Sequence, residues 1–241
     1  MYTWFVVNSK RIMSAIADNL QAVRARIANA AVATGRSPDT VRLLAVSKTW
    51  PLSCILEAAD AGQCAFGENY VQEGIDKIAA ITGRNLEWHF IGPLQSNKSR
   101  SVAERFDWVH SIERLKIAER LSAQRPAYLA PLQVCIQVNV SGETSKSGCA
   151  PDEAPGLCKS IAALPGLRLR GLMAIPEPTD SIDAQRLPFR QLRQIYEHIR
   201  AAGLPLDTLS MGMSHDLEAA VAEGATIVRI GTAIFGERNY A

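Results

Sequence analysis

Several motifs that would identify a metalloprotein, a hydrolase or a dinucleotide enzyme are missing from this sequence. Its five cysteines form no C-x-x-C pair, and its four histidines are scattered with no H-x-x-x-H motif. The G-x-S-x-G turn of α/β-hydrolases and the G-x-G-x-x-G dinucleotide loop are also absent. A zinc site, a disulfide framework and a serine-hydrolase nucleophile are therefore not indicated. We expect free thiols, a reducing compartment and a cytoplasmic location.

The sequence also lacks a large excess of positive or negative charge. The chain carries 26 Lys and Arg against 24 Asp and Glu, a net charge of +2, with no long basic run, so no nucleic-acid partner is predicted. The apolar stretch Met1–Val7 is too short to span a membrane, and the charges at Lys10 and Arg11 follow it, which is the wrong order for a secretory signal. We predict that residues 1–12 are a disordered or dispensable extension and that residues 13–241 form one domain.

The 241-residue chain does contain a regular alternation of apolar runs and amphipathic segments. The apolar runs predict eight strands, at Val41–Ser47, Cys64–Gly67, Leu86–Ile91, Trp108–Ser111, Leu132–Asn139, Leu169–Ala174, Thr208–Met211 and Thr226–Ile230. Helices are predicted at Ser14–Ala33, Leu52–Ala61, Val71–Ile81, Asn97–Arg105, Glu113–Gln124, Pro151–Leu164, Ile182–Ala202 and Ser214–Glu223.

This order of elements is typical of parallel βαβ units. Eight strands in this length predict a single TIM-type (β/α)8 barrel with an extra N-terminal helix, Ser14–Ala33. A doubly wound open sheet is the alternative, because a count of strands does not establish closure. The irregular stretch Pro176–Pro188, after the sixth strand, is either a lid over the strand ends or a surface loop.

Lys48 is the first candidate for chemistry. It follows the buried run Leu43–Val46, and Thr49-Trp50-Pro51 then breaks the strand and opens a helix. Parallel α/β folds place their active sites at this edge of the sheet. An amine held there against apolar neighbours loses hydration, so its pKa falls and the nucleophilic form needed for a Schiff base becomes available. The rival reading is a strand-ending lysine in water. Lys146, in a Gly/Ser-rich loop, is a second rival for covalent chemistry.

Two turns at the ends of the seventh and eighth predicted strands favour a phosphate-bearing ligand. In TIM-type barrels the loops after these strands commonly bind phosphate. In the first turn Gly212 permits a tight bend and Ser214 is a good helix N-cap, whose exposed N–H groups suit an anion. Met211 belongs to the same turn and is counted among the binding candidates. In the second turn Gly231 removes a side chain and Thr232 offers a hydroxyl.

Three further residues have two readings each. Asn69 is either a ligand-binding amide or a helix cap, and His89 either touches the ligand or is a core histidine with its polar atoms satisfied. Arg229 shares the face of Gly231 in the eighth strand by alternation, and its guanidinium points either inward to a ligand or outward to the helical layer.

These segments together resemble a known family. They are Leu-Leu-Ala-Val-Ser-Lys48, Phe-Gly-Glu-Asn69-Tyr, Trp-His-Phe-Ile-Gly92 through Lys98, Ser-Lys146-Ser-Gly, Gly171-Leu-Met, Met-Gly-Met-Ser214 and Val-Arg229-Ile-Gly-Thr-Ala-Ile-Phe-Gly. From about Met13 to the C-terminus the chain resembles the pyridoxal phosphate homeostasis protein family. One departure is His215, where an acidic residue is usual.

The resemblance implies a barrel like the N-terminal domain of bacterial alanine racemase. It implies pyridoxal 5′-phosphate held as a Schiff base on the lysine matching Lys48, with the phosphate on the turns matching Ser214 and Gly231-Thr232. Arg229 matches the arginine that faces the pyridine nitrogen. The resemblance also implies a role in intracellular vitamin B6 homeostasis, and so the delivery of cofactor to transiently bound PLP-dependent apoenzymes.

We predict a binding protein without robust catalysis. A cation at Arg229 lowers the pKa of the pyridine nitrogen and weakens the ring as an electron sink. Racemases of this fold take a catalytic tyrosine from a separate domain of another subunit, and we expect no such domain and a monomeric protein. The alternatives are a weak racemase or related amino-acid enzyme, and a barrel enzyme acting on a phosphorylated sugar through Lys48.

Overall fold

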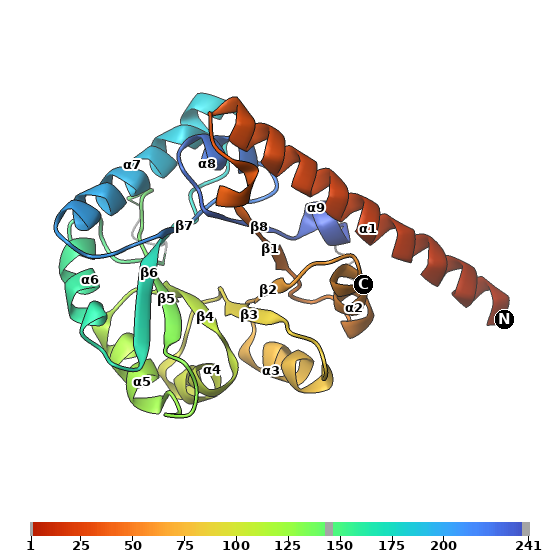
Figure 1. The fold of residues 1–241 in the computed structure, drawn as a ribbon, viewed down its shortest axis with the longest axis horizontal. Helices are drawn as coiled ribbons and strands as arrows, with labels where there is room; N and C mark the ends of the chain where they lie inside the picture. The colour runs from red at the N-terminus through yellow and green to blue at the C-terminus, as the bar shows by residue number, and fades with distance from the viewer. Residues whose placement is uncertain (1, 143–146, 238–241) are drawn as a thin grey trace.

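The computed structural model of the protein describes residues 2–142 and 147–237, with side chains from residue 15 onward. Eight parallel strands form a closed barrel in sequence order, and the last strand pairs with the first (Figure 1). The strands are β1 (Arg42–Val46), β2 (Ala65–Glu68), β3 (Glu87–Phe90), β4 (Trp108–Ile112), β5 (Leu132–Gln137), β6 (Leu167–Met173), β7 (Thr208–Ser210) and β8 (Ile227–Ile230). The predicted TIM barrel is confirmed, and the open sheet is excluded.

Helices surround the barrel between successive strands, as Figure 1 shows. They are α1 (Tyr2–Ala33), α2 (Leu52–Asp60), α3 (Val71–Ala80), α4 (Ser99–Arg105), α5 (Leu115–Gln124), α6 (Ala154–Ala162), α7 (Ile182–Ala201), α8 (Leu217–Ala222) and α9 (Thr232–Phe235), with short 3-10 turns η1 (Pro38–Thr40) and η2 (Ser96–Lys98). The short helix α9 and both 3-10 turns are additions to the predicted elements.

The N-terminal helix α1 lies outside the barrel and packs against α2, α8 and α9. Ile16, Leu20, Val23 and Ile27 form its buried stripe, at the spacing of one helix face. The helix begins at Tyr2 rather than at Ser14, because residues 2–33 contain neither glycine nor proline to stop it. That residues 1–12 are dispensable stays a prediction.

The predicted helix start at Ser214 is wrong, whereas the predicted helix start at Ile182 is confirmed and shortens the irregular stretch after β6. Ser214 does not cap a helix: α8 begins at Leu217 with Asp216 at its N-cap, and the carboxylate of Asp216 accepts a hydrogen bond from the N–H of Met213 (2.5 Å), which closes a turn. The stretch Pro176–Pro188 is irregular only up to Ser181, because α7 begins at Ile182 and includes Pro188.

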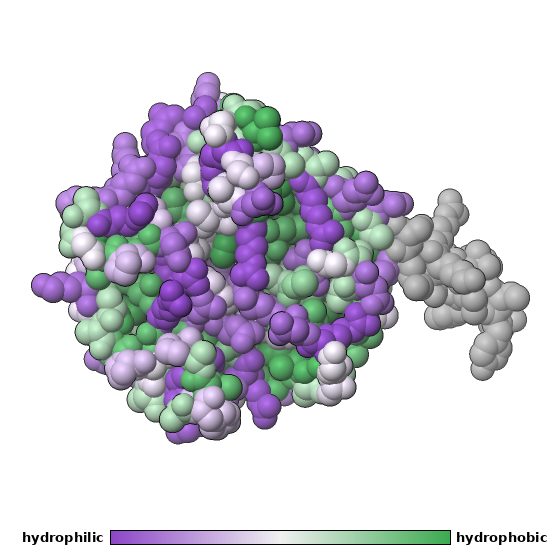
Figure 2. All heavy atoms as spheres, in the orientation of Figure 1, coloured by the Kyte–Doolittle hydropathy of each residue, from purple (hydrophilic) through white to green (hydrophobic). Residues whose placement is uncertain are grey.

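Apolar residues fill two regions. The larger core lies between the strands and the helices and includes Phe66, Phe90 and Phe189, each fully buried. A smaller cluster fills the barrel interior: Leu44, Ala65, Trp108, Cys135, Met173 and Ile227. On the surface, hydrophilic and hydrophobic side chains are interspersed over the face seen in Figure 2. Within the described chain, no helix has the length and apolarity to cross a bilayer.

The approach of β6 to β7 requires one glycine. Gly171 is in register with Thr208, and a Cβ atom at Gly171 would overlap the carbonyl oxygen of Thr208. A backbone carbonyl in a sheet has little room to move, so β6 and β7 would have to separate to admit even a methyl group.

We therefore expect Gly171→Ala to lower the free energy of unfolding by about 3 kcal/mol, at the upper end of the usual cost of overpacking. Gly156→Ala is the matched control, because Gly156 lies in α6 with open space around its Cβ position. It should raise stability by up to about 1 kcal/mol. Urea unfolding of both variants measures the change in the free energy of unfolding. Equal changes in the two variants would contradict the claim that β6 and β7 lie too close at Gly171 to admit a methyl group.

Candidate functional site

A pocket of about 220 Å³ opens where the carboxyl ends of the strands meet the following loops. Its lining combines a lysine, an arginine, polar turns and apolar side chains: Val46, Lys48, Asn69, Ile91, Ile175, Met213, Ser214, His215, Arg229, Gly231 and Thr232. Most of these residues lie at or just beyond the end of a strand. Closure of the barrel is what gathers them, since β1 and β8 come from opposite ends of the chain.

Lys48 reaches this pocket from the turn after β1. The strand ends at Val46, Ser47 is fully buried, and Lys48 is half-buried in the pocket wall. Thr49 follows with φ 67°, a left-handed conformation that β-branched residues rarely adopt. Lys48 therefore does not simply end the strand in open water, as the rival reading of the sequence had it.

The side chain of Arg229 points into the barrel rather than outward to the helical layer. It is 4% exposed, and its guanidinium donates to the carbonyl oxygens of Ser210 (2.6 Å) and Ala174 (2.8 Å) and to the Ser210 hydroxyl (2.8 Å). Burial lowers the pKa of Arg229 to about 10, opposed by the charge of Asp216. Arg229 is thus a cation at neutral pH in a pocket that also holds Lys48.

The two glycine turns have different physical origins. Gly212 has φ 94°, its carbonyl accepts from the Arg229 N–H (2.9 Å), and an added Cβ would lie 2.5 Å from that of Ala220. Gly231 has an ordinary φ of −116°, but its Cβ would lie 3.2 Å from the carbonyl oxygen of Val46. Thr232 begins α9, so its N–H has no acceptor within that helix.

Asn69 contributes an unsatisfied acceptor to the pocket. Its Oδ1 atom is buried and has no hydrogen-bond partner among the described residues. Buried polar atoms are nearly always paired, so an orphaned oxygen in a pocket wall indicates a place for a donor on a ligand. Asn69 is the N-terminal neighbour of Tyr70, the N-cap residue of α3, so it is not itself the cap that the sequence allowed.

The structure brings together six of the eight residues predicted for the site. The six are Lys48, Asn69, Ser214, Arg229, Gly231 and Thr232. Met211 is instead fully buried in the core beside the turn, and Met213 lines the pocket in its place. Sequence reasoning also missed Val46, Ile91, Ile175 and His215. Ile91 and Ile175 lie just after strand ends, as the polar candidates do. This position in the sequence could have identified them as pocket-lining residues.

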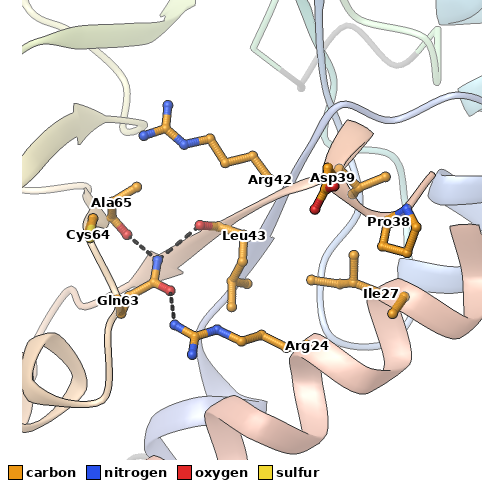
Figure 3. Close-up of a pocket in the computed structure, with 11 residues that line it drawn as sticks. Arg24, Ile27, Pro38, Asp39, Arg42, Leu43, Gln63, Cys64 and Ala65 are labelled. Atoms are coloured by element: carbon orange, nitrogen blue, oxygen red, sulfur yellow. Dashed lines mark hydrogen bonds between the residues drawn. The ribbon is translucent and has the colours of Figure 1, made fainter.

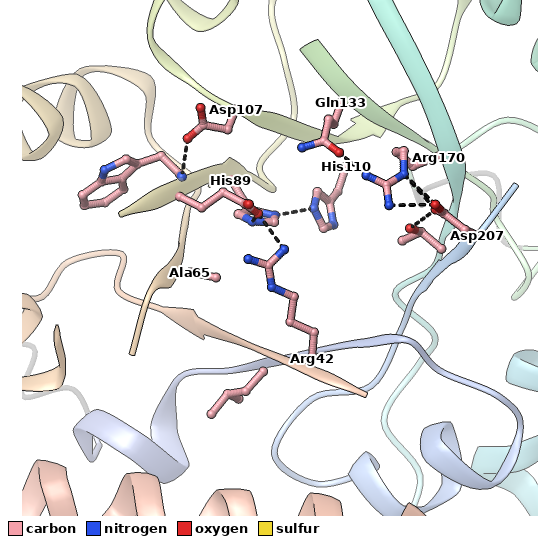
Figure 4. Close-up of polar contacts among 12 residues, drawn as sticks. Arg42, Ala65, His89, Asp107, His110, Gln133, Arg170 and Asp207 are labelled. Atoms are coloured by element: carbon pink, nitrogen blue, oxygen red, sulfur yellow. Dashed lines mark hydrogen bonds and ion pairs between the residues drawn. The ribbon is translucent and has the colours of Figure 1, made fainter. Parts of the chain in front are cut away.

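His89 lies below the pocket in a hydrogen-bonded chain through the barrel interior (Figure 4). The Ser210 hydroxyl accepts from Arg229, so its own proton is free for His110 Nδ1 (2.7 Å). His110 Nε2 then donates to His89 Nδ1 (2.8 Å), and His89 Nε2 donates to Glu87 (2.5 Å). Both imidazoles are neutral in this arrangement. His89 is thus a core histidine whose two ring nitrogens both have hydrogen-bond partners.

A larger hollow, of about 480 Å³, lies at the amino ends of β1 and β2 (Figure 3). Its polar groups bond to one another: Arg24 donates to Gln63 (3.4 Å) and to the carbonyl of Ala61 (3.0 Å), and Gln63 donates to the carbonyls of Leu43 and Ala65. We assign no ligand to this hollow, because Arg24 and Gln63 already have hydrogen-bond partners and the hollow lies away from the carboxyl ends of the strands.

The fold and the pocket define a class of protein, the single barrel of the alanine racemase N-terminal type. The family model described as "Alanine racemase, N-terminal domain" matches residues 13–239. Alanine racemase from Corynebacterium glutamicum superposes with a TM-score of 0.72 over 94% of this chain and 62% of that chain. At 19% identity, this likeness shows the fold alone.

Closer relatives narrow the assignment. The chain is 61% identical over 228 residues to the pyridoxal phosphate homeostasis protein of Pseudomonas aeruginosa, covering 95% of this chain and 98% of that one. The protein of the same name from Escherichia coli K12 is 57% identical, covering 95% and 99%. PipY of Synechococcus elongatus, solved with PLP bound, is 38% identical with a TM-score of 0.81, covering 92% and 100%. The chain belongs to the pyridoxal phosphate homeostasis protein family, which confirms the resemblance.

The two buried histidines, His89 and His110, should make the free energy of unfolding depend on pH. Burial lowers the pKa of His89 and lowers that of His110 further, so both stay neutral in the folded protein while the unfolded chain takes up protons below about pH 6.5. Stability should therefore be complete above that pH and fall on acidification, by up to about 1.4 kcal/mol per pH unit for each histidine.

Urea unfolding between pH 7.5 and 5.5 measures this slope, and His110→Asn should reduce it. Burial opposes ionisation of Glu87, but its bonds to His89 and Arg42 outweigh burial and lower the pKa of Glu87 to about 2. Its contribution is therefore lost only below about pH 4.5, outside this range. A wild-type stability that does not change down to pH 5.5 would contradict neutral buried imidazoles.

Proposed function

We propose that this protein binds pyridoxal 5′-phosphate through a Schiff base between the cofactor's aldehyde and the amine of Lys48, and that it takes part in intracellular vitamin B6 homeostasis. The observation that carries the proposal is the meeting of Lys48, Arg229 and two glycine turns in one pocket. The names of the curated relatives and the PLP bound to PipY support the same ligand.

The residues present fit the phosphate end of this cofactor. Gly231 leaves room beside Val46, and the N–H of Thr232 at the start of α9 is a donor without an intrahelical acceptor. The hydroxyls of Ser214 and Thr232 lie in the same pocket wall and add neutral donors. The guanidinium of Arg229, a cation in the same pocket, supplies a positive field for the anion.

The residues also fit the ring. The orphaned Oδ1 of Asn69 offers an acceptor to a donor on the ligand, and Ile91 and Ile175 provide apolar surface. Pyridoxal phosphate, when bound, supplies an aldehyde for the amine and a ring that can delocalise electrons. Arg229, held by two carbonyl oxygens, remains charged and disfavours a proton on a nitrogen placed beside it.

We propose on this basis a role in buffering and delivery of the cofactor, without robust catalysis, in a monomeric cytoplasmic protein that contacts PLP-dependent apoenzymes only transiently. A ring with an unprotonated nitrogen is a poor electron sink, so proton abstraction from a bound amino acid would need strong acid–base help. No tyrosine is among the described lining residues. The imidazole of His215 lies in the pocket wall but is exposed to solvent.

The lysine assignment is tested by trapping. Wild-type protein incubated with equimolar pyridoxal phosphate and reduced with borohydride should carry one pyridoxyl group, and peptide mass mapping should locate it at Lys48. Lys48→Ala should weaken cofactor affinity at least tenfold while keeping the fold, and Lys159→Ala on the surface of α6 is the control. Wild-type adduct found mainly at Lys146, which is outside the described residues, would contradict the assignment.

The absence of robust catalysis is tested separately. Protein saturated with pyridoxal phosphate, incubated with L-alanine and followed by chiral chromatography, should form less than one equivalent of the D enantiomer per protein over hours. Other amino acids with small and basic side chains should give the same result. Many turnovers that depend on Lys48 would favour the alternative, an amino-acid racemase of low activity, over the carrier.

A further inference from the structure

A buried ion cluster outside the barrel holds the turn that carries Lys48. Lys77 of α3 is 7% exposed, and its ammonium donates to Glu68 Oε1 (2.8 Å), to Glu73 Oε1 (2.6 Å) and to the carbonyl oxygen of Ser47 (2.8 Å). Glu68 ends β2 and is fully buried, whereas Glu73 is partly exposed on α3. The cluster therefore joins β2 and α3 to the backbone directly after β1.

The same three side chains hold the backbone on both sides of Lys48. The hydroxyl of Ser47 donates to Glu68 Oε1 (2.6 Å), while the Ser47 carbonyl accepts from Lys77. On the other side, the N–H of Thr49 donates to Glu73 Oε1 (2.5 Å). Both residues that flank Lys48 are thus bonded to carboxylates that share one ammonium group.

The backbone of this turn is strained, so it needs such support. Thr49 is the one non-glycine residue in the described chain with a positive φ, at 67°. Threonine is disfavoured there because its branched Cβ crowds the backbone, and such conformations persist only where the surroundings impose them. Two bonds hold this conformation: the Trp50 N–H donates to the carbonyl oxygen of Ser47 (3.1 Å), which closes the turn, and the Thr49 N–H donates to Glu73.

Stability alone is a weak reason for burying these charges. A buried ion pair seldom stabilises a fold more than apolar residues of the same size would, because both charges lose their hydration. Burial raises the pKa of Glu68 although its hydrogen bonds to Lys77 and Ser47 lower it. One of its oxygens, Oε2, has no partner within the described residues. What the charges provide is directional bonding to a particular piece of backbone, the turn at Lys48.

We infer that Lys77, acting with Glu68 and Glu73, is a positioning residue for Lys48, which fixes the Ser47–Thr49 backbone so that the Lys48 amine is presented to the pocket. This inference rests on the proposed function, in which Lys48 forms the Schiff base. Its consequence is selective: preorganisation of the amine strengthens ligands that bond to Lys48, and not ligands held only by the β7 and β8 turns.

The test compares two ligands that differ in that bond. Pyridoxal 5′-phosphate can condense with an amine, whereas pyridoxine 5′-phosphate has an alcohol in place of the aldehyde and cannot. Lys77→Met keeps the length and packing of the side chain but removes the ammonium. We expect it to weaken pyridoxal phosphate binding about tenfold, to change pyridoxine phosphate binding less than twofold, and to speed hydrogen exchange of the Lys48 and Thr49 amides.

The matched control is Asp76→Asn, on the adjacent, exposed position of α3, where the side chain bonds only to Gln72 in the described contacts. It should leave both affinities unchanged. Glu73→Ala is the milder second variant, because Glu73 is partly exposed and its removal frees the Thr49 N–H without stranding Lys77 from Glu68. If Lys77→Met fails to fold, Glu73→Ala provides the test instead. We expect it too to weaken pyridoxal phosphate binding while leaving pyridoxine phosphate binding nearly unchanged.

Equal loss of both ligands would overturn the inference in favour of a general structural role, and so would unchanged affinity for both. Failure of the proposed function looks different. In that case the wild-type protein itself would show no reducible adduct at Lys48 and no preference for the aldehyde over the alcohol. The exchange rates of the Lys48 and Thr49 amides would still report whether the cluster holds this turn.

Discussion

The pairing of β8 with β1 is the constraint on which the site depends. Leu44 is in register with Arg229 and Ala45 with Ile230, so the ends of the two strands lie side by side although they are far apart in the sequence. Lys48 leaves one strand and Gly231 follows the other, and both line the same pocket. An open sheet would separate these ends. A ligand with an aldehyde at one end and a phosphate at the other is therefore matched to a closed barrel.

Buried cations organise both sides of this junction. Arg229 lies inside the barrel and is held by carbonyl and hydroxyl oxygens from β7 and the end of β6. Lys77 lies outside and is held by two carboxylates and the carbonyl of Ser47. Each has polar partners that offset lost hydration, so each can occupy one fixed position. One cation sets the charge within the pocket, and the other holds the turn of the lysine that we propose reacts there.

Much of this was predictable from sequence, for identifiable reasons. The eight strands were found because buried parallel strands are continuous apolar runs, and Lys48 was found because it ends such a run. The orientation of Arg229 was not predictable, because its partners at Ala174 and Ser210 are distant in sequence. Ser214 was wrongly made a helix cap because Asp216, two residues later, closes the turn instead. The position of Lys77 gave no sequence signal, since its bonds to Glu68 and to the Ser47 carbonyl exist only once α3 packs on β2 beside the turn that follows β1.

A crystal structure of the protein reduced with borohydride in the presence of pyridoxal phosphate would test the central claim most directly. The account predicts continuous density from Lys48 Nζ to a phosphate bound by the turns at Ser214 and Thr232, with Arg229 beside the ring. A phosphate pointing instead toward the Pro176–Ser181 loop, or density attached to any other lysine, would contradict it.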